Sequence, residues 1–309
     1  MTFKVLVTCP PMLKQIKKFD TVFKSFNIEY TAPTIIQTMS IDDLLNEVPK
    51  HDGWIIGDDP ATYEVFRAGK EGNLKAAVKW GIGTDNVDFE ACTKLGIPIT
   101  NTPGMFGNEV ADIAMCYVLG LAREAFYVDR EVRKGSWPKP CGISLLNKNI
   151  GIIGLGDIGK NIAKRAHAHG LNVIGWDPSA GTLPGYIQLA RLWPEKLDEC
   201  DFIVFACALN DQTHHMFNDS ILQYLKHDVK IINVSRGPLI NELSLIKAID
   251  AGIVKSAALD VFEEEPPSMS NKILSNDKCI FGSHNGSNTI DAVERASNHA
   301  IEIIYNMLK

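Results

Sequence analysis

The chain has 309 residues, of which 45% are hydrophobic and 22% charged, and its net charge is −6 at pH 7. This length and apolar content predict about two domains, each with a sizeable core. The acidic balance and the lack of a basic tract argue against nucleic acid and anionic membranes as partners. Seven scattered cysteines without a C-x-x-C pair favour reduced thiols in a cytoplasmic protein, and no metal site is expected.

Short apolar segments alternate with helical patterns along the chain. Strands are predicted at Lys4–Val7, Gly53–Ile56, Ala76–Lys79, Asn149–Ile153, Asn172–Trp176, Phe202–Phe205, Lys230–Asn233 and Ser256–Leu259. Helices are predicted at Asp42–Val48, Asp88–Leu95, Asn108–Phe126, Lys160–His169, Glu242–Ala251 and Ile290–Lys309. This alternation predicts a parallel, doubly wound α/β architecture.

Neither a secretory signal nor a membrane span is expected. The first apolar stretch includes Lys4 and reads as a β-strand, unlike the apolar core of a signal peptide. The longest apolar segment, near Val110–Ala122, is too short to cross a bilayer and is interrupted by Asp112.

A glycine pattern follows the strand predicted at Asn149–Ile153. Gly154, Gly156 and Gly159 form G-x-G-x-x-G between that strand and a helical pattern. In this context the first glycine permits a tight turn, the second lets the backbone approach a pyrophosphate, and the third allows close helix–sheet packing. The N-terminus of the following helix offers unpaired N–H groups to the phosphates. The pattern predicts a dinucleotide site.

Asp177 ends the next predicted strand, 23 positions after Gly154 (177 − 154). A carboxylate at this place accepts hydrogen bonds from the ribose hydroxyls and repels a 2′-phosphate. No Arg or Lys follows it until Arg191. The sequence therefore predicts NAD as the cofactor in preference to NADP.

Three polar segments in the second half of the chain lie where a strand ends. They are Asn233–Pro238, Leu259–Pro266 and Phe281–Gly286. Ligands of open α/β sheets bind at the carboxyl ends of the strands, so these segments are candidates for a catalytic site.

Several motifs together resemble the D-isomer-specific 2-hydroxyacid dehydrogenase family, most closely its phosphoglycerate dehydrogenase branch in a short form. They occur in the family's order over nearly the whole chain. They are Trp80–Asp88, Gly96–Gly104, Val110–Asp112, Trp137, the glycine fingerprint, Ser235–Gly237, Ala258–Phe262 and the loop of His284.

The resemblance implies two doubly wound, Rossmann- and flavodoxin-like α/β domains with a cleft between them. Residues 1–102 and 286–309 would form the substrate domain, and residues 103–285 the NAD-binding Rossmann domain. Closure of the cleft would exclude water from the substrate. The helix at Asn108–Phe126 would help to build a homodimer.

The family's catalytic residues fall on Arg236, Glu265 and His284. Arg is a permanently charged planar group suited to a carboxylate and to a keto oxygen. His284 can give a proton to the forming alkoxide and take it back in the oxidative direction. A carboxylate bonded to that histidine would fix its tautomer and raise its pKa. A shift of one residue would instead select Glu264.

The resemblance also implies the ligand contacts. Asp260 would meet the nicotinamide carboxamide, and the backbone N–H groups of Ile82 and Gly83 would bind the substrate carboxylate, together with Arg236. The remaining cofactor contacts would be Gly154, Gly156, Asp157, Ile158, Gly159, Asp177, Cys207, Val234, Ser235, Arg236, His284 and Gly286.

Each of these residues has an ordinary structural explanation when taken alone. An arginine can cap a helix, a histidine can simply be packed, and Glu263–Glu265 resembles a solvated acidic run. Their joint occurrence in matching surroundings favours the catalytic interpretation.

The sequence departs from the phosphoglycerate dehydrogenase pattern at Ile56–Pro60. This stretch carries Asp58 and Asp59 where that branch has an arginine for the substrate phosphate. Two carboxylates would oppose a phosphate, so 3-phosphoglycerate is disfavoured unless another base replaces the arginine.

A glyoxylate or hydroxypyruvate reductase using the same residues is an alternative. A non-enzymatic NAD(H)-sensing protein of the same fold is a second alternative, and a formate dehydrogenase is a weaker one.

Overall fold

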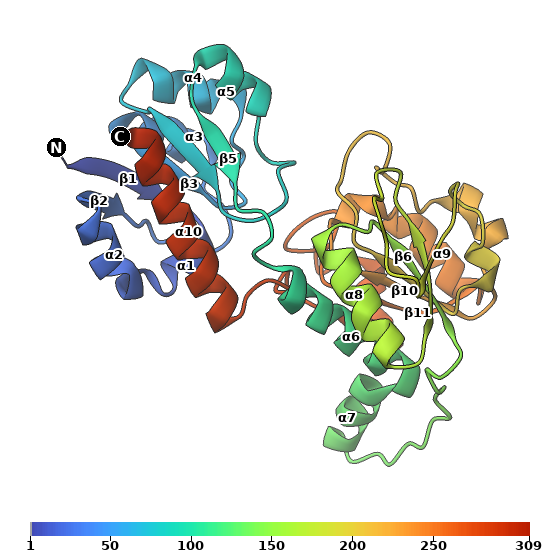
Figure 1. Ribbon diagram of the computed structural model, residues 1–309. Helices are drawn as coiled ribbons and strands as arrows, with labels where there is room; N and C mark the ends of the chain where they lie inside the picture. The colour runs from blue at the N-terminus through green and yellow to red at the C-terminus, as the bar shows by residue number, and fades with distance from the viewer. Residues whose placement is uncertain (1) are drawn as a thin grey trace. The chain divides into compact units, whose positions relative to one another are not determined.

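The computed structural model describes residues 2–309, which divide into two compact units. Unit 1 extends to Phe106 and resumes at Asn288, so it contains the C-terminal helix. Unit 2 is the continuous segment Gly107–Ser287. The C-terminal helix α10 (Ile290–Leu308), red in Figure 1, accordingly lies with the blue N-terminal strands.

Unit 1 is built on a five-stranded parallel sheet with the order β2-β1-β3-β4-β5. This is the strand order of flavodoxin-like folds. The strands are β1 (Phe3–Val7), β2 (Ile28–Thr31), β3 (Gly53–Ile56), β4 (Ala76–Lys79) and β5 (Ile99–Asn101). The helices are α1 (Pro10–Leu13), α2 (Asp20–Ser25), α3 (Ile41–Glu47), α4 (Tyr63–Glu71) and α5 (Phe89–Leu95), with 3-10 turns at Ile16–Phe19 and Val48–Lys50.

Local chemistry fixes the ends of these helices. The Ser40 side chain accepts a hydrogen bond from the N–H of Asp43 at the start of α3, and Asp88 does the same for Ala91 at the start of α5. Helix α5 ends at Leu95 and is followed by Gly96, whose φ of 63° is left-handed and suits glycine.

Unit 2 is built on a seven-stranded parallel sheet with the order β12-β11-β10-β9-β6-β7-β8. The chain starts at β6, adds β7 and β8 on one side and then places β9 on the other. The order therefore reverses beside β6, which is where open α/β sheets bind ligands. The strands are β6 (Asn149–Ile153), β7 (Asn172–Trp176), β8 (Ile187–Leu189), β9 (Phe202–Phe205), β10 (Val229–Asn233), β11 (Val254–Leu259) and β12 (Ile280–Phe281).

Buried apolar strands form the centre of unit 2. All residues of β9 and β10 are buried, as expected for parallel strands covered on both faces. The α-helices are α6 (Gly107–Arg123), α7 (Ala125–Arg133), α8 (Asp157–Ala168) and α9 (Glu242–Asp250). Short 3-10 turns lie at Leu197–Glu199, Asp219–Tyr224, Gly237–Leu239 and Lys272–Ser275.

The helix predicted at Asn108–Phe126 is wrong at its C-terminal end. Helix α6 stops at Arg123, Glu124 takes a left-handed φ of 53°, and α7 begins at Ala125. The turn brings the ring of Phe126 back onto α6, where a Cβ on Gly120 would lie 2.5 Å from the ring atom Cε2. A contact at this distance leaves no room for a side chain at position 120.

The eight predicted strands are confirmed within two residues at their ends, but four further strands were not predicted. These four are β2, β5, β8 and β12, which are the two edge strands of each sheet. They are two to four residues long and partly exposed. Edge strands lack the continuous apolar run that identifies a strand covered on both faces.

Among the described residues, no helix combines the length and the apolar character that a membrane crossing would need.

Candidate active site

The glycine fingerprint forms the turn between β6 and α8. Gly154 has a left-handed φ of 90°, and a Cβ there would lie 2.6 Å from the Cα of Cys207. A Cβ on Gly159 would lie 1.9 Å from the carbonyl oxygen of Gly154. In contrast, a Cβ on Gly156 would meet no protein atom within 4 Å. The turn is therefore closely packed at its first and third glycines and open at the second, which leaves the room that a pyrophosphate needs.

Asp177 follows β7 and ties the fingerprint turn to the neighbouring strand. Its Oδ2 accepts a hydrogen bond from the N–H of Leu155 at 2.7 Å, and its Oδ1 accepts one from the N–H of Ser179 at 2.8 Å. Each carboxylate oxygen can accept a second bond, so both remain usable for ribose hydroxyls. The carboxylate thus lies directly beside the open position at Gly156.

Cys207 and Ser235 follow the adjacent strands β9 and β10. The Ser235 hydroxyl donates to the carbonyl of Cys207, which joins the two loops. Burial raises the pKa of the Cys207 thiol to about 12, so this cysteine is a neutral packing group.

Asp260 follows β11 and is 3% exposed. Its Oδ1 accepts a hydrogen bond from the hydroxyl of Tyr117 at 2.9 Å, and its Oδ2 accepts one from the N–H of Gly286 at 2.9 Å. Its carbonyl accepts the N–H of His284 at 2.7 Å. Asp260 therefore fixes the backbone of the His284 loop as well as bordering the expected nicotinamide position.

Tyr117 contacts a residue of the candidate site, which the sequence did not indicate. It lies within α6, 143 positions before Asp260, and burial raises its pKa well above the usual range. A tyrosine in an apolar helix reads simply as core, and only the folded chain shows that its hydroxyl is bonded to the Asp260 carboxylate.

His284 and Glu265 form the central pair. The Nδ1 atom of His284 lies 2.7 Å from Oε2 of Glu265, and both side chains are about one quarter exposed, at 27% and 25%. Oε1 of Glu265 accepts the N–H of Phe262 at 3.0 Å. Of the two glutamates left open by the sequence, the structure pairs Glu265 with the histidine. His284 has a left-handed φ of 53°, an uncommon conformation for a residue with a side chain.

Arg236 lies in the loop after β10. Its carbonyl accepts a hydrogen bond from the side-chain amide of Asn233 at 2.8 Å, and its Nη1 donates to the carbonyl of Ser235 at 2.8 Å. Arg236 and His284 thus follow β10 and β12, the two neighbours of β11, and Asp260 and Glu265 follow β11 itself. The expected catalytic residues of unit 2 consequently share one edge of its sheet.

In unit 1, the loop after β4 carries Ile82 and Gly83. The two backbone carbonyls before Ile82 accept hydrogen bonds. Lys79 Nζ donates to the carbonyl of Trp80 at 3.2 Å, and the N–H of Thr102 donates to the carbonyl of Gly81 at 3.2 Å. The side-chain amide of Asn101 binds the carbonyl of Ile82 at 3.1 Å. Across residues 2–309, none of the hydrogen bonds found uses the N–H of Ile82 or Gly83 as donor. These two N–H groups are the pair expected to bind a carboxylate.

The two acids of the loop at Ile56–Pro60 have different surroundings, so they do not oppose a phosphate together. Asp59 is fully buried and accepts hydrogen bonds from the backbone N–H groups of Met39 and Gly57 and from the hydroxyl of Thr8, while burial raises its pKa. Asp58 forms an ion pair of 3.0 Å with Lys79, whose side chain is 3% exposed. A cation therefore does lie beside this loop, although it is already engaged.

Known proteins of one family are similar to this chain. The family model described as "D-isomer specific 2-hydroxyacid dehydrogenase, NAD binding domain" matches residues 115–286. A hydroxypyruvate reductase of Thermotoga maritima is 35% identical over 275 residues, covering 86% of this chain and 88% of that protein. A D-3-phosphoglycerate dehydrogenase of Methanocaldococcus jannaschii is 32% identical, covering 99% of this chain and 57% of that protein. The crystal structure of the TT0316 protein from Thermus thermophilus is similar, with a TM-score of 0.87, 27% identity and coverage of 99% and 96%.

The chain therefore belongs to the D-isomer specific 2-hydroxyacid dehydrogenase family, and it is an NAD-dependent oxidoreductase of 2-hydroxy acids. It spans about half the length of several D-3-phosphoglycerate dehydrogenases that it matches.

Proposed function

We propose that this chain reversibly reduces a small, non-phosphorylated 2-keto acid, such as hydroxypyruvate or glyoxylate, with His284 as the acid and base. The observation that carries the proposal is the 2.7 Å contact between His284 and Glu265 at the carboxyl edge of the unit 2 sheet. A histidine held by a carboxylate on Nδ1 can exchange a proton through Nε2.

The two units divide the work in this proposal. Unit 1 is the substrate domain, expected from residues 1–102 and 286–309. Unit 2 is the NAD-binding domain, expected from residues 103–285. The family model for the NAD-binding domain lies within unit 2, at residues 115–286.

The residues of unit 2 fit an NAD cofactor. The N–H groups of Asp157, Ile158 and Gly159 at the start of α8 would bind the pyrophosphate beside the open Gly156. Asp177 would bind the adenosine ribose and repel a 2′-phosphate. The nicotinamide would lie against Cys207, Val234, Ser235, Asp260 and Gly286. When bound, NADH supplies the hydride for C2 of the keto acid.

The protein's own groups supply the remaining chemistry. Glu265 holds Nδ1 of His284, so that Nε2 gives its proton to the forming alkoxide oxygen during reduction and accepts it during oxidation. Arg236 binds the carboxylate and polarises the keto oxygen. We propose that the N–H groups of Ile82 and Gly83, in unit 1, also bind the substrate carboxylate.

The hydrogen bonds of Lys79 favour a substrate that carries no phosphate. Its ammonium has three N–H donors, and three acceptors surround it: the carbonyl of Gly57 at 2.7 Å, Asp58 at 3.0 Å and the carbonyl of Trp80 at 3.2 Å. A phosphate would have to displace one of these bonds. The hydroxypyruvate reductase of Thermotoga maritima, which is named for a substrate without a phosphate, is 35% identical to this chain.

A panel of keto acids tests the proposal. We expect the purified protein to oxidise NADH with hydroxypyruvate or glyoxylate at a kcat/KM at least about tenfold above that with phosphohydroxypyruvate. Pyruvate, oxaloacetate and a branched-chain keto acid complete the panel. Parallel assays with NADPH should give lower kcat/KM values because Asp177 repels the 2′-phosphate.

A preference for phosphohydroxypyruvate would contradict the argument from Lys79 and Asp58. Tight NADH binding without turnover on any member of the panel would instead favour an NAD(H)-sensing protein.

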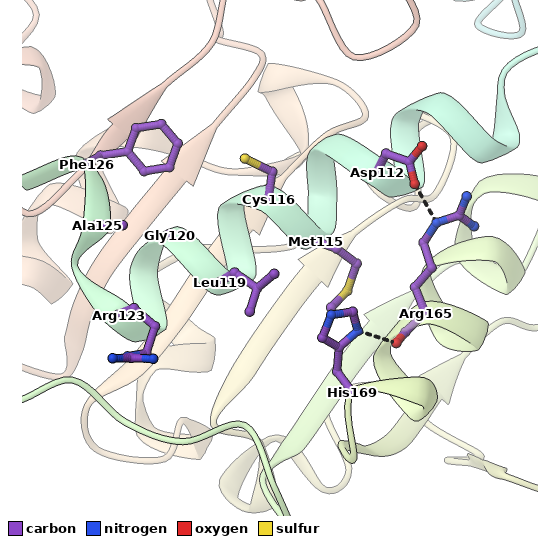
Figure 2. Close-up of a pocket in the computed structure, with 10 residues that line it drawn as sticks. All are labelled: Asp112, Met115, Cys116, Leu119, Gly120, Arg123, Ala125, Phe126, Arg165 and His169. Carbon is purple, nitrogen blue, oxygen red and sulfur yellow. Dashed lines mark hydrogen bonds and ion pairs between the residues drawn. The ribbon is translucent and has the colours of Figure 1, made fainter. Parts of the chain in front are cut away.

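A homodimer built on the face of α6 and α7 is also part of the proposal. Large apolar side chains are exposed on these helices and on the segment that follows them, with Leu119 at 38%, Val132 at 42% and Trp137 at 77% exposure. A pocket of about 580 Å³ lies over α6 beside α7 and α8 (Figure 2). Cys116, Leu119 and Phe126 line it, and the Arg165–Asp112 ion pair of 2.6 Å lies at one end. Exposed apolar surface of this kind is typical of a subunit contact.

Sedimentation measures the assembly directly. We expect a mass near twice the 34.1 kDa of one chain, and we expect Leu119→Glu to shift the protein toward the monomer because a charge would be buried in the contact. A wild-type mass of one chain would contradict the proposed dimer.

A reducing cytoplasm suits the free cysteines of the chain, two of which, Cys116 and Cys141, are exposed.

A further inference from the structure

Two glutamates hold each other's backbone near the His284–Glu265 pair. Glu242 is the first residue of α9, and Glu263 lies two residues before Glu265 in the loop after β11. The N–H of Glu263 donates to Oε1 of Glu242 at 2.8 Å, and the N–H of Glu242 donates to Oε2 of Glu263 at 3.1 Å. We call this reciprocal pair of bonds the Glu242–Glu263 clasp.

Further partners engage the other two carboxylate oxygens of the clasp. The side-chain amide of Asn271 binds Oε2 of Glu242 at 2.5 Å, and Nε2 of His215 lies 2.5 Å from Oε1 of Glu263. Glu263 also lies at the N-terminus of α9, where the helix dipole favours a negative charge. Two adjacent carboxylates would repel each other, so this complete set of donors explains why they can lie together. Glu242 is 8% exposed, which makes the loss of its contacts costly.

The clasp joins the start of α9 to the loop that carries Glu265. Glu265 accepts the N–H of Phe262, the residue immediately before Glu263, so the orientation of the Glu265 carboxylate depends on this short backbone segment. On the other loop, Gly237 follows Arg236, and a Cβ on Gly237 would lie 1.8 Å from the carbonyl oxygen of Phe262. The segments after β10 and β11 are therefore in backbone contact at this point.

We infer that Glu242, acting through Glu263, is a positioning residue that sets the orientation of the Glu265 carboxylate against His284. Neither Glu242 nor Glu263 touches the substrate in this inference. It rests on the proposed roles of Glu265 and His284. Loss of the Glu242 carboxylate removes a hydrogen bond from the Phe262–Glu265 backbone segment and makes that segment more mobile. The Glu265 carboxylate then contacts Nδ1 of His284 for a smaller fraction of the time.

The titration of the His284 imidazole tests this directly and needs no substrate. The protein would be labelled with ¹³C-histidine, and the signal of His284 among the eight histidines would be assigned by its loss in His284→Gln. In Glu242→Ala the titration midpoint should fall by roughly half a pH unit, because the imidazolium loses part of the stabilisation from the carboxylate. Glu242→Gln keeps an oxygen that can accept the N–H of Glu263, so its midpoint should stay near that of the wild type.

Two further variants make the result decisive. Glu263→Ala breaks the same clasp from a side chain that is 32% exposed, so it remains informative if Glu242→Ala does not fold. Lys247→Ala removes an exposed ion pair of 2.8 Å between α9 and Asp219 without touching the clasp, and it should not move the midpoint. The other titratable groups on these loops are unchanged in all variants; they include Arg236, Asp260, Glu264 and His215, whose imidazole contacts Glu263.

An unmoved midpoint in the folded Glu242→Ala and Glu263→Ala proteins would overturn the inference. An equal shift in Lys247→Ala would also overturn it, because the effect would then come from α9 as a whole. If the wild-type protein turns over a keto acid, the alkaline limb of kcat/KM for reduction should move to lower pH together with the midpoint. A failure of the proposed function would appear instead as absent turnover in the wild type, which leaves the titration result intact.

Discussion

His284→Gln should lower kcat for keto acid reduction by about 100- to 10,000-fold, the range typical for loss of a general acid. Glutamine has similar size and polarity but cannot carry a proton to the alkoxide. The fold should persist, because His284 is partly exposed and its backbone N–H, which binds the carbonyl of Asp260 at 2.7 Å, remains. Steady-state kinetics would measure kcat, and NADH fluorescence would show whether cofactor affinity remains within about threefold of the wild type.

Glu265→Gln is the matched variant for this prediction. It keeps the hydrogen bond to the N–H of Phe262 but removes the negative charge beside Nδ1 of His284. We expect a smaller loss of kcat, about tenfold, and a fall of kcat/KM for reduction that begins at lower pH, because an imidazolium without its carboxylate loses its proton more readily. Full activity in His284→Gln would refute the assigned proton donor.

Alanine substitutions at Gly156 and Gly159 should have different consequences although the two residues belong to one turn. A Cβ on Gly159 would meet the carbonyl oxygen of Gly154 at 1.9 Å, so Gly159→Ala must displace α8 from β6. We expect Tm to fall by roughly 5 °C, the effect of an overpacked core site, together with a loss of NADH binding. Gly156→Ala meets no protein atom within 4 Å, so we expect an unchanged Tm and an NADH Kd raised at least about tenfold, since the methyl group occupies the space for the pyrophosphate.

Thermal unfolding and NADH titration of the same samples would separate these effects. Gly185→Ala is the control, because its position also has open space around it and lies outside the fingerprint. A Gly156→Ala protein that binds NADH as tightly as the wild type would place the cofactor elsewhere.

The sequence was sufficient for the interior of both sheets and for the local signals at their ends. Buried parallel strands need continuous apolar runs, and such runs identified in advance eight of the twelve strands found in residues 2–309. The four edge strands could not be found in this way, because one side of each lacks a neighbouring strand and their residues are partly exposed. The break at Glu124 was missed because it depends on the packing of Phe126 against Gly120.

In the candidate site, too, some residues could be recognised from the sequence and others only from the structure. Gly154, Asp177 and the segment before Arg236 could be recognised because the required chemistry follows a strand within a few residues, and the sheet brings strand ends together. The resemblance of the motifs to a known family supplied His284 and Glu265. Tyr117, Lys79 and Glu242 gave no local signal, because each acts through a partner distant in the chain, such as Asp260, 143 positions after Tyr117.

The sequence by itself determined the class of fold, the choice of NAD and the family of the reaction, since each follows from local patterns and from their order along the chain. The tertiary structure decided that Glu265 and not Glu264 holds the histidine, that Asp59 is buried while Asp58 is paired with Lys79, and that Glu242 and Glu263 clasp the loops of the site. The physical reason is that side-chain orientation and charge pairing depend on contacts between segments far apart in the chain, and these contacts exist only after the strands have assembled into sheets.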